Sequence, residues 1–236
     1  MAIFQKRLEG LTNDETYFAK VFTVNHKERV NNRIDLPVVS AMPRASRLPH
    51  GYTEVEYIES TGSQYINTGV TGISGLMADG AMMPLSIPAS GGAVFLGAYP
   101  PQWYMVYFNK GSTGYSYNSW KSGSKGMQVG VKHEFAVDFT GGNQSFKLDG
   151  EVICSSNIAE TVCSSSLFAF AGNISGGASY FAIARLYNLR MYTKDTLLRD
   201  FVPCVSDVDG AGLFDLVSKT FYKNLGSGSF IAGPAV

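Results

Sequence analysis

The segment KHEFAVDFTGGNQSFKLDGEVI, residues 132–153, constrains the fold of this chain more than any other segment. In it Phe135, Val137 and Phe139 alternate with polar or small residues, so their large side chains share one face of a strand. Apolar runs then flank the dipeptide Asp149–Gly150, which favours a two-residue hairpin turn. The segment therefore predicts three consecutive antiparallel strands.

The composition indicates an all-β protein. The 236 residues include 26 glycines, 13 tyrosines and 15 phenylalanines, and only 16% of the residues are charged. This mixture is typical of many short strands joined by tight turns. The length suits one large sandwich domain with an appendage, because all-β domains often exceed the usual domain size.

The first 46 residues differ from the rest of the chain. Residues 1–50 contain eight basic and five acidic residues, a formal charge of about +3, which leaves about −3 for the remainder. Pro37, Pro43 and Pro49 favour an extended chain at the end of this segment. We interpret residues 1–46 as an arm that becomes ordered against a partner, and residues 47–236 as the domain. The alternatives are a flexible leader or an added strand on the domain's own sheet.

Short apolar runs within the arm leave its secondary structure open. Residues 17–24 are compatible with a strand, and the apolar residues between 3 and 11 fit one face of a short helix. The first residues carry charges where a signal peptide requires an unbroken apolar stretch, and no later segment has the length of a transmembrane helix. We therefore expect synthesis in a cytoplasm without a signal peptide. The net charge of zero argues against nucleic acid or a membrane as a partner.

The cysteines and histidines suggest no metal or cofactor. They are Cys154, Cys163, Cys204, His26, His50 and His133. The odd number of cysteines and the lack of a C-x-x-C spacing predict reduced, buried thiols rather than a disulfide framework or a thiolate metal site. The histidines lack the spacing of zinc ligands, and no nucleotide-binding loop or G-x-S-x-G motif is present. We expect no cofactor and no metal.

The segment Glu54-Val55-Glu56-Tyr57-Ile58-Glu59 raises the question of catalysis. Family-16 glucanases use a similar E-x-D-x-x-E string, in which one carboxylate is the nucleophile and another is the acid/base. In a regular strand, however, Glu54 and Glu56 share a face and Glu59 points the other way. The string also lies at the start of the domain and departs from the glucanase pattern at its middle acid. We favour an exposed polar strand face over a catalytic site.

The segment Asp207-Val208-Asp209-Gly210 invites comparison with a calcium loop. Gly212 fits the sixth position of such a loop, but Ser218 occupies the twelfth, where a bidentate glutamate is needed. A surface turn in which the aspartates bond to their own backbone is the preferred interpretation. A weak calcium site remains an alternative without assignable ligands.

A dense aromatic cluster is the strongest candidate for a binding site. The candidate glycan-binding residues are Trp103, Tyr104, Tyr115, Tyr117, Asn118 and Trp120. Aromatic faces beside amide groups suit the apolar face and hydroxyls of a sugar ring. Packing within a sandwich core is the alternative. Because both faces of residues 103–108 are apolar, we expect the outward face to meet a neighbouring subunit or the arm.

Four segments together resemble the laminin-G-like (concanavalin-A-like) lectin domains that recur in phage and prophage proteins. They are LPHGYTEVEYIESTGSQYINTGV, KHEFAVDFTGGNQSFKLDGEVI, SYFAIARLYNLRMY and TLLRDFVPCVSDVDGAGLFDLVSKTFYKN. The resemblance covers residues 48–234 and implies an antiparallel two-sheet jelly-roll sandwich. Its motifs are structural, so they specify the fold far better than the activity.

The resemblance implies a non-enzymatic phage virion structural protein located in the virion. Such a protein would decorate the capsid, head fibre or tail and contact other virion proteins, and we expect a homo-oligomer. The candidate anchoring residues of the arm are Phe4, Arg7, Tyr17, Phe18, Phe22, Arg29 and Arg33. The alternatives are a carbohydrate-binding module that attaches to host or mucosal glycans and, less favoured, a glycan hydrolase that uses Glu54 and Glu56.

Overall fold

The computed structural model describes residues 17–19, 39–41 and 47–236. The chain divides into two units, Met1–Arg47 and Leu48–Val236. In the first unit β1 (Tyr17–Ala19) pairs antiparallel with β2 (Val39–Ala41).

Most of the predictions for the arm concern residues that lie outside the described ones. The predicted helix over residues 3–11 does so, and β1 covers the first three residues of the predicted strand over 17–24. Tyr17 and Phe18 belong to β1. The other candidate anchoring residues lie outside the described residues: Phe4, Arg7, Phe22, Arg29 and Arg33.

The smaller of two sheets in the second unit has eight strands. Its order is β10-β9-β8-β7-β14-β5, and β15 pairs with both β7 and β16. The strands are β5 (Ile66–Gly72), β7 (Ala93–Tyr99), β8 (Tyr104–Asn109), β9 (Ser112–Tyr117), β10 (Trp120–Ser122), β14 (Cys163–Ala169), β15 (Gly172–Ile174) and β16 (Gly177–Ser179).

The larger sheet has eleven strands in the order β13-β12-β11-β6-β17-β18-β19-β20, with β3, β4 and β21 paired beside this path. The strands are β3 (Tyr52–Glu54), β4 (Ile58–Thr61), β6 (Met77–Pro84), β11 (His133–Asp138), β12 (Gln144–Leu148), β13 (Glu151–Ser156), β17 (Ile183–Tyr192), β18 (Leu197–Ser206), β19 (Gly210–Asp215), β20 (Thr220–Tyr222) and β21 (Ile231–Ala232).

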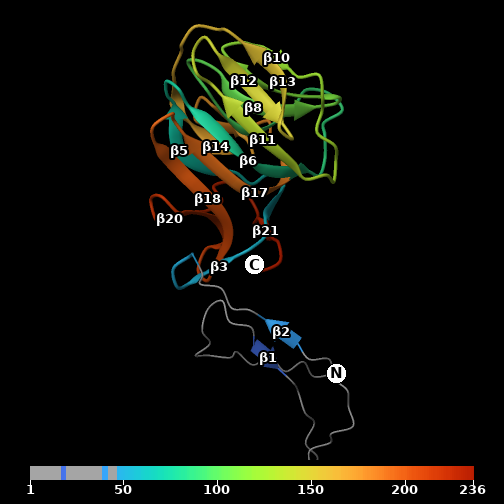
Figure 1. Ribbon diagram of the computed structural model, residues 1–236, viewed down its shortest axis with the longest axis vertical. Coiled ribbons are helices and arrows are strands. Elements are labelled where there is room, and N and C mark those ends of the chain that lie inside the picture. The colour runs from blue at the N-terminus through green and yellow to red at the C-terminus, as the bar shows by residue number, and fades with distance from the viewer. Residues whose placement is uncertain (1–16, 20–38, 42–46) are drawn as a thin grey trace, which may run out of the picture. The chain divides into compact units, whose positions relative to one another are not determined.

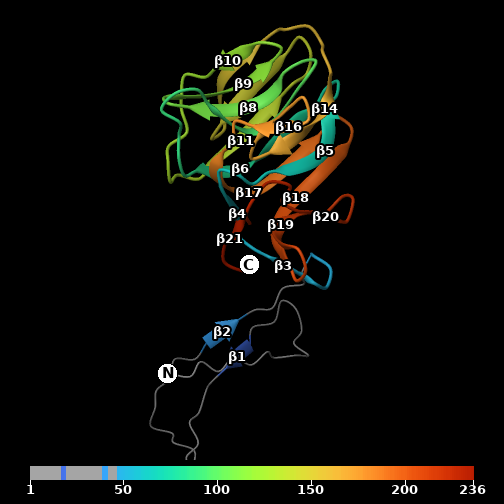
Figure 2. The same cartoon turned by 180° about the vertical axis from the view of Figure 1, so that it is seen from behind.

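The two sheets pack face to face as a sandwich, seen from opposite sides in Figures 1 and 2. All strand pairs are antiparallel among the described residues except β15 with β7. The described residues contain no helix, and therefore none that is long and apolar enough to cross a membrane.

The predicted three-strand segment is confirmed as β11, β12 and β13. Phe135 lies opposite Leu148 and Val137 lies opposite Phe146, so four apolar side chains of one face enter the core. The turn from β12 to β13 is formed by Asp149–Gly150, where φ is 51° and 82°. A positive φ at both central residues is what a type I′ hairpin requires, which explains why the dipeptide predicts the turn.

Three tyrosines and a phenylalanine form one aromatic group of the core. The ring of Tyr104 lies 5.0 Å from those of both Tyr117 and Phe139, and Tyr115 is 6.3 Å from Phe139. All four side chains have no exposed surface. The prediction that Tyr104, Tyr115 and Tyr117 contact a glycan is therefore corrected: they alternate into the core side of β8 and β9.

Each core hydroxyl finds a partner at the end of β13 or in the segment that follows it. Tyr104 donates to the carbonyl of Thr161 (2.6 Å), and Tyr117 accepts from the backbone N–H of Thr161 (2.8 Å). The hydroxyls of Tyr115 and Ser156 are 2.6 Å apart. Burial, together with the hydrogen bond to Tyr117, raises the pKa of Tyr104 far above its usual range. Each of the three hydroxyls is hydrogen-bonded, as buried polar groups require.

The three cysteines are free thiols, with Cys163 and Cys204 buried and Cys154 half-buried. Burial raises the pKa of Cys154 to about 11 and that of Cys204 to about 12. These thiols are protonated at neutral pH, and the thiolate is the form that binds metal or attacks disulfides.

Asp215 is the one fully buried acid among the described residues, and it organises the turn after β19. Its carboxylate accepts backbone N–H groups from Asp200 (2.8 Å), Val217 (3.1 Å) and Ser218 (3.1 Å), and also the Ser218 hydroxyl (2.6 Å). Arg199 Nε lies 3.7 Å away. Burial alone would raise the pKa of Asp215, but the hydrogen bonds outweigh it and the pKa is lowered.

We expect Asp215→Ala to lower the free energy of unfolding by about 3 kcal/mol at pH 7, because four donors lose their charged acceptor. Because the pKa of Asp215 is lower in the folded state, its carboxylate stabilises the fold at pH values above the unfolded pKa of about 3.9. That contribution to the free energy of unfolding is lost as the pH falls through the pKa of the folded state. Urea unfolding at pH 7 and pH 3 measures both effects. Asp215→Asn keeps the shape of the side chain and should reduce the loss of unfolding free energy between pH 7 and pH 3. An unchanged pH dependence in Asp215→Asn would show that Asp215 is not the source of this loss.

Candidate functional site

The outer face of the smaller sheet carries a second apolar cluster. Alternation along β8 sends Met105 and Tyr107 away from the core, where they pack with Val94 of β7. Both side chains are nevertheless almost fully buried, because Trp103 and Ile174 of β15 pack against the same cluster. The sequence correctly predicts an apolar outward face on this strand. The domain's own residues cover that face, whereas we expected a second subunit or the arm to do so.

Four aromatic rings lie in contact across this face, and we call them the aromatic ladder. Tyr99 stacks on Trp103 with centroids 4.2 Å apart and planes at 20°. Trp103 lies 5.6 Å from Trp120, and Trp120 meets Tyr107 edge-on at 4.8 Å. Ring pairs of this geometry stabilise one another beyond their buried area. The ladder therefore fixes Trp120, whose side chain is 50% exposed, on the edge strand β10.

A hollow of about 370 Å³ lies beside Trp120, and we call it the aromatic hollow. Its second exposed ring is Tyr180, which is 54% exposed and follows β16. The backbone N–H of Val94 donates to the carbonyl of Tyr180 (2.8 Å), so Tyr180 lies beside β7. The complete lining is Gly91, Gly92, Val94, Tyr107, Asn109, Trp120, Ser122 and Tyr180.

Three polar side chains line the aromatic hollow. The hydroxyls of Tyr107 and Ser122 are 2.9 Å apart, and Tyr107 also donates to the carbonyl of Lys121 (3.2 Å). Burial raises the pKa of Tyr107 despite the opposing hydrogen bond to Ser122, so the phenol stays neutral. Asn109 accepts the Ser112 hydroxyl through Oδ1 (2.5 Å), which leaves its NH₂ group without a partner among the described residues. The hollow thus offers a fixed amide donor and a hydroxyl pair.

Glycine brings the edge strand close enough to complete the hollow. Gly114 pairs with Tyr107 on one side and with Ser122 on the other. A Cβ at Gly114 would lie 2.0 Å from the carbonyl oxygen of Lys121, so any side chain there would push β10 away. Across β8 to β10 (Figure 2), this close approach places Trp120 and Ser122 beside Tyr107.

The structure separates the predicted glycan-binding residues into three groups. Trp103 and Trp120 belong to the aromatic ladder, whereas Tyr104, Tyr115 and Tyr117 lie in the core. Asn118 is exposed in the turn before β10, with φ of 54° and its N–H bonded to the carbonyl of Trp103 (3.2 Å). It does not line the aromatic hollow.

Sequence reasoning missed the part of the lining that comes from other segments. Gly91 and Gly92 precede β7, and Tyr180 lies some 60 residues after the aromatic cluster. No local pattern links them to Trp120. Tyr107 and Asn109, by contrast, stand in the aromatic run itself, where the alternation of β8 could have selected them.

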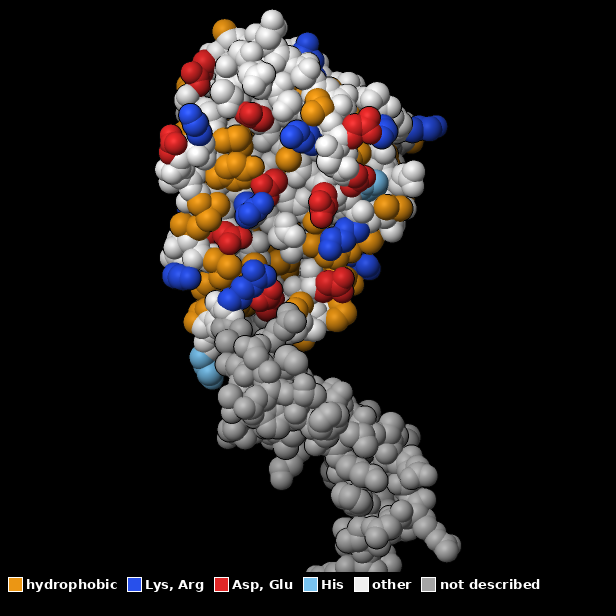
Figure 3. Space-filling view, viewed as in Figure 1, with side chains coloured by type: hydrophobic (Ala, Val, Ile, Leu, Met, Phe, Trp, Pro, Cys, Tyr) orange, Lys and Arg blue, Asp and Glu red, His pale blue; other side chains and the backbone are white. Residues whose placement is uncertain are grey.

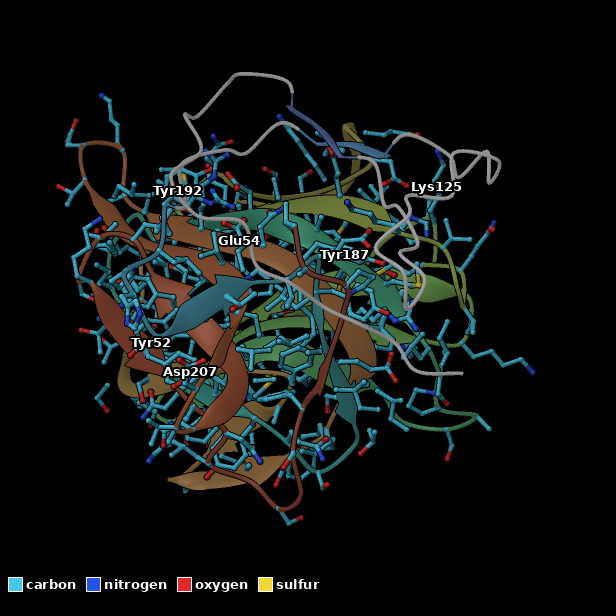
Figure 4. All side chains as sticks on the ribbon, turned by 90° about the horizontal axis from the view of Figure 1, so that it is seen from below. Tyr52, Glu54, Lys125, Tyr187, Tyr192 and Asp207 are labelled. Carbon is cyan, nitrogen blue, oxygen red and sulfur yellow. The ribbon has the colours of Figure 1, made fainter. Side chains whose placement is uncertain are left out.

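The acidic string is divided between two strands. The expected single strand is interrupted: Glu54 ends β3, which pairs with β18, whereas Glu59 lies on β4, which pairs with β17. Glu59 forms an ion pair with Arg185 (2.8 Å), and that guanidinium lies 4.3 Å from the ring of Tyr57. Figure 4 views this end of the domain with Glu54 labelled. The carboxylate of Glu59 is held by a structural contact.

Asp207 to Asp209 form the turn between β18 and β19, and Gly210 begins β19, so the predicted turn is confirmed. Among the described residues, however, Ser206 and not an aspartate accepts the backbone N–H groups of the turn. Ser206 Oγ accepts the N–H groups of Val208 and Asp209 (both 3.3 Å), and Asp209 pairs with Lys223 (3.0 Å). Within the described residues no three His, Cys, Asp or Glu side chains gather closely enough to hold a metal ion.

A second hollow, of about 330 Å³, lies on the outer face of the larger sheet, and we call it the polar groove. Its charged lining includes Asp79, Glu134, Lys147 and Arg190, and Arg190 holds Asp79 through two hydrogen bonds of 2.8 and 3.1 Å. Figure 3 shows acidic and basic side chains interspersed over the domain. The groove lacks exposed aromatic rings, so the aromatic hollow is the better candidate for a binding site.

Comparison with solved structures identifies the fold. A provisionally assigned carbohydrate-binding protein of Bacteroides ovatus has a TM-score of 0.57 and 10% identity over 84% of this chain and 68% of that chain. A heptameric SAP-like pentraxin from Limulus polyphemus has a TM-score of 0.50 and 10% identity over 78% and 94%. Domains LG4-5 of the mouse laminin α1 chain have a TM-score of 0.44 and 9% identity over 65% and 46%. No protein-family model and no curated protein matches the sequence.

The chain therefore has an antiparallel two-sheet jelly-roll sandwich fold, which it shares with the Bacteroides ovatus protein and the pentraxin. The predicted fold class is confirmed. Identities of about 10% extend this conclusion to the fold and no further.

The two sides of the smaller sheet should respond differently to truncation. Tyr104→Ala should lower the free energy of unfolding by about 3–5 kcal/mol, because it leaves a cavity and unpaired polar groups in the core. Trp120→Ala should cost about 1 kcal/mol or less, because the side chain is half exposed. Urea unfolding of both variants tests this, and equal losses would place Trp120 in the core.

Proposed function

We propose that the domain formed by residues 48–236 binds carbohydrate at the aromatic hollow. The observation that carries the proposal is the exposed, ring-supported side chain of Trp120 beside the polar groups of Asn109 and Ser122. A sugar presents apolar C–H groups on one face and hydroxyls around its edge, which match a fixed aromatic face and nearby hydrogen-bonding side chains. The carbohydrate-binding description of the Bacteroides ovatus protein supports this choice among the functions of the fold.

In this proposal the ring of Trp120 supplies the stacking surface. Contacts with Trp103 and Tyr107 hold that ring in place before binding, so little side-chain entropy is lost when a ligand arrives. The NH₂ group of Asn109 donates to a ring hydroxyl, and the Tyr107–Ser122 pair can exchange one of its bonds for a ligand hydroxyl.

The proposed role is binding without catalysis. Glycoside hydrolysis generally requires two carboxyl groups that flank the scissile bond. The eight described residues that line the hollow include no Asp or Glu. The hydrolase alternative uses Glu54 and Glu56. Glu54 ends β3 of the larger sheet, and neither residue lines the aromatic hollow.

Glycan binding by the full-length chain tests the proposal. An array identifies ligands, and titration calorimetry compares the wild type with Trp120→Ala, which should bind at least tenfold more weakly, or about 1.4 kcal/mol. Leu225→Ala is a matched control, because Leu225 is 52% exposed and does not line the hollow. Glycan affinity that survives Trp120→Ala and Tyr180→Ala would reject the aromatic hollow as the site.

We also propose that residues 1–46 attach the domain to a phage virion and thereby display the aromatic hollow. Two observations support this role: the resemblance of the sequence to phage-associated lectin domains, and the division of the chain into the units Met1–Arg47 and Leu48–Val236. Other virion proteins are the partners in this proposal, and the assembled virion is the location.

Deletion of residues 1–46 should leave the domain folded, because it removes none of the strands β3 to β21 that form the two sheets. The truncated chain should be missing from purified particles that incorporate the full-length chain. Immunoblots of particles from cells that express either form measure this. Particles that contain the truncated chain would place the attachment in the domain.

A further inference from the structure

We infer that the aromatic hollow selects an uncharged sugar ring and discriminates against acidic sugars. This inference rests on the proposed carbohydrate binding and specifies its ligand class. Among the eight described lining residues none is Asp, Glu, Lys, Arg or His. The polar contacts of a ligand would therefore all be with neutral groups.

The lysines nearest in sequence do not line the hollow. Lys121 lies between Trp120 and Ser122 on β10, and alternation along a strand sends its side chain to the other side. Consistent with this, Lys121 acts electrostatically on Cys154 of β13, where it partly offsets the effect of burial on the thiol pKa. Lys110 is exposed in the turn after Asn109.

A carboxylate in this hollow would lose hydration without gaining a cation. Burying a charged group without a charged or multiply bonded partner costs far more than burying a hydroxyl. The NH₂ group of Asn109 provides neutral donors, and the Tyr107 hydroxyl already donates to the carbonyl of Lys121. A hydroxymethyl group can form hydrogen bonds with these neutral side chains. A carboxylate at the same position would find no charged group to compensate for its lost hydration.

The dimensions suit one ring between two aromatic side chains. Trp120 stands on β10, which lies three strand spacings, or about 14 Å, from β7, and Tyr180 is bonded to Val94 of β7. Both side chains narrow that span, and the volume of about 370 Å³ is near the lower end for small-molecule sites. A single sugar ring can stack on Trp120 and be flanked by Tyr180.

The opposite sheet provides an internal comparison. The polar groove there combines Asp79, Glu134, Lys147 and Arg190 with an open volume of about 330 Å³. A charged ligand would find partners in that groove and not in the aromatic hollow. We therefore expect the affinity for neutral sugars to depend on Trp120, and any affinity for acidic sugars to be independent of it.

Matched sugars that differ only at C6 test the inference on the full-length chain. The probes are the methyl glycosides of glucose, galactose and mannose and those of the corresponding uronic acids, titrated at pH 7. The readouts are the indole N–H resonances of Trp103 and Trp120 in NMR spectra, with affinity from calorimetry. We expect at least one neutral sugar to shift the Trp120 resonance and to bind at least tenfold more tightly than its uronate.

Substitutions test whether the selectivity between neutral and acidic sugars arises in the aromatic hollow. Asn109→Lys introduces a cation into the lining and should raise uronate affinity at least tenfold, whereas Lys110→Ala should change neither class of sugar. Uronate binding that persists in Trp120→Ala and is lost in Lys147→Ala agrees with the inference, because it belongs to the polar groove.

Two results would overturn the inference and are distinguishable from each other. A uronate that shifts the Trp120 resonance and binds as tightly as its neutral counterpart refutes the selectivity but leaves carbohydrate binding intact. Failure of every neutral and acidic sugar, on the array and in the titrations, to bind or to shift either indole resonance refutes the proposed function itself.

Discussion

The structure depends on how three buried tyrosines are satisfied. Tyr104, Tyr115 and Tyr117 fill the space between the sheets with their rings, yet each carries a hydroxyl that cannot be left without a partner in the core. The segment from Ser156 to Thr161 supplies those partners. Its course over the core is therefore specified by the hydroxyls as well as by chain connectivity.

The strand β8 joins the core to the candidate site. Its inward side chains, Tyr104, Val106 and Phe108, are buried among the two sheets, and its outward side chains, Met105 and Tyr107, support the aromatic ladder. Because successive side chains of a strand point to opposite faces, a shift of the strand would move both sets together. The position of the ring of Tyr107, and through it that of Trp120, is thus fixed by core packing.

Local patterns predicted the parts of the fold that depend on local rules. The hairpin at Asp149–Gly150 and the alternation in β11 follow from the backbone preferences of adjacent residues, and both are present. The assignment of the two faces of β8 could not follow in this way, because both faces are apolar. The core covers one face, and Trp103 and Ile174 of β15 pack against the other.

The same limit explains the errors in the site residues. Composition placed Tyr104 and Trp120 in one aromatic group, although burial separates them completely. The regular strand expected through Glu54 and Glu59 breaks because the two ends pair with different neighbours, β18 and β17. Tyr180 joins the hollow through a hydrogen bond to Val94, a contact between residues far apart in sequence that only the folded topology creates.

The position of Tyr180 also relates the hollow to folding. The lining requires the segment before β7, the edge strand β10 and the residue after β16 to be in place together, so it exists only when the smaller sheet is complete. Contacts between such distant segments form late and slowly in β proteins. A ligand that recognises the complete hollow has no partial site on the unfolded chain, and its binding energy accordingly adds to the stability of the whole domain rather than to one loop.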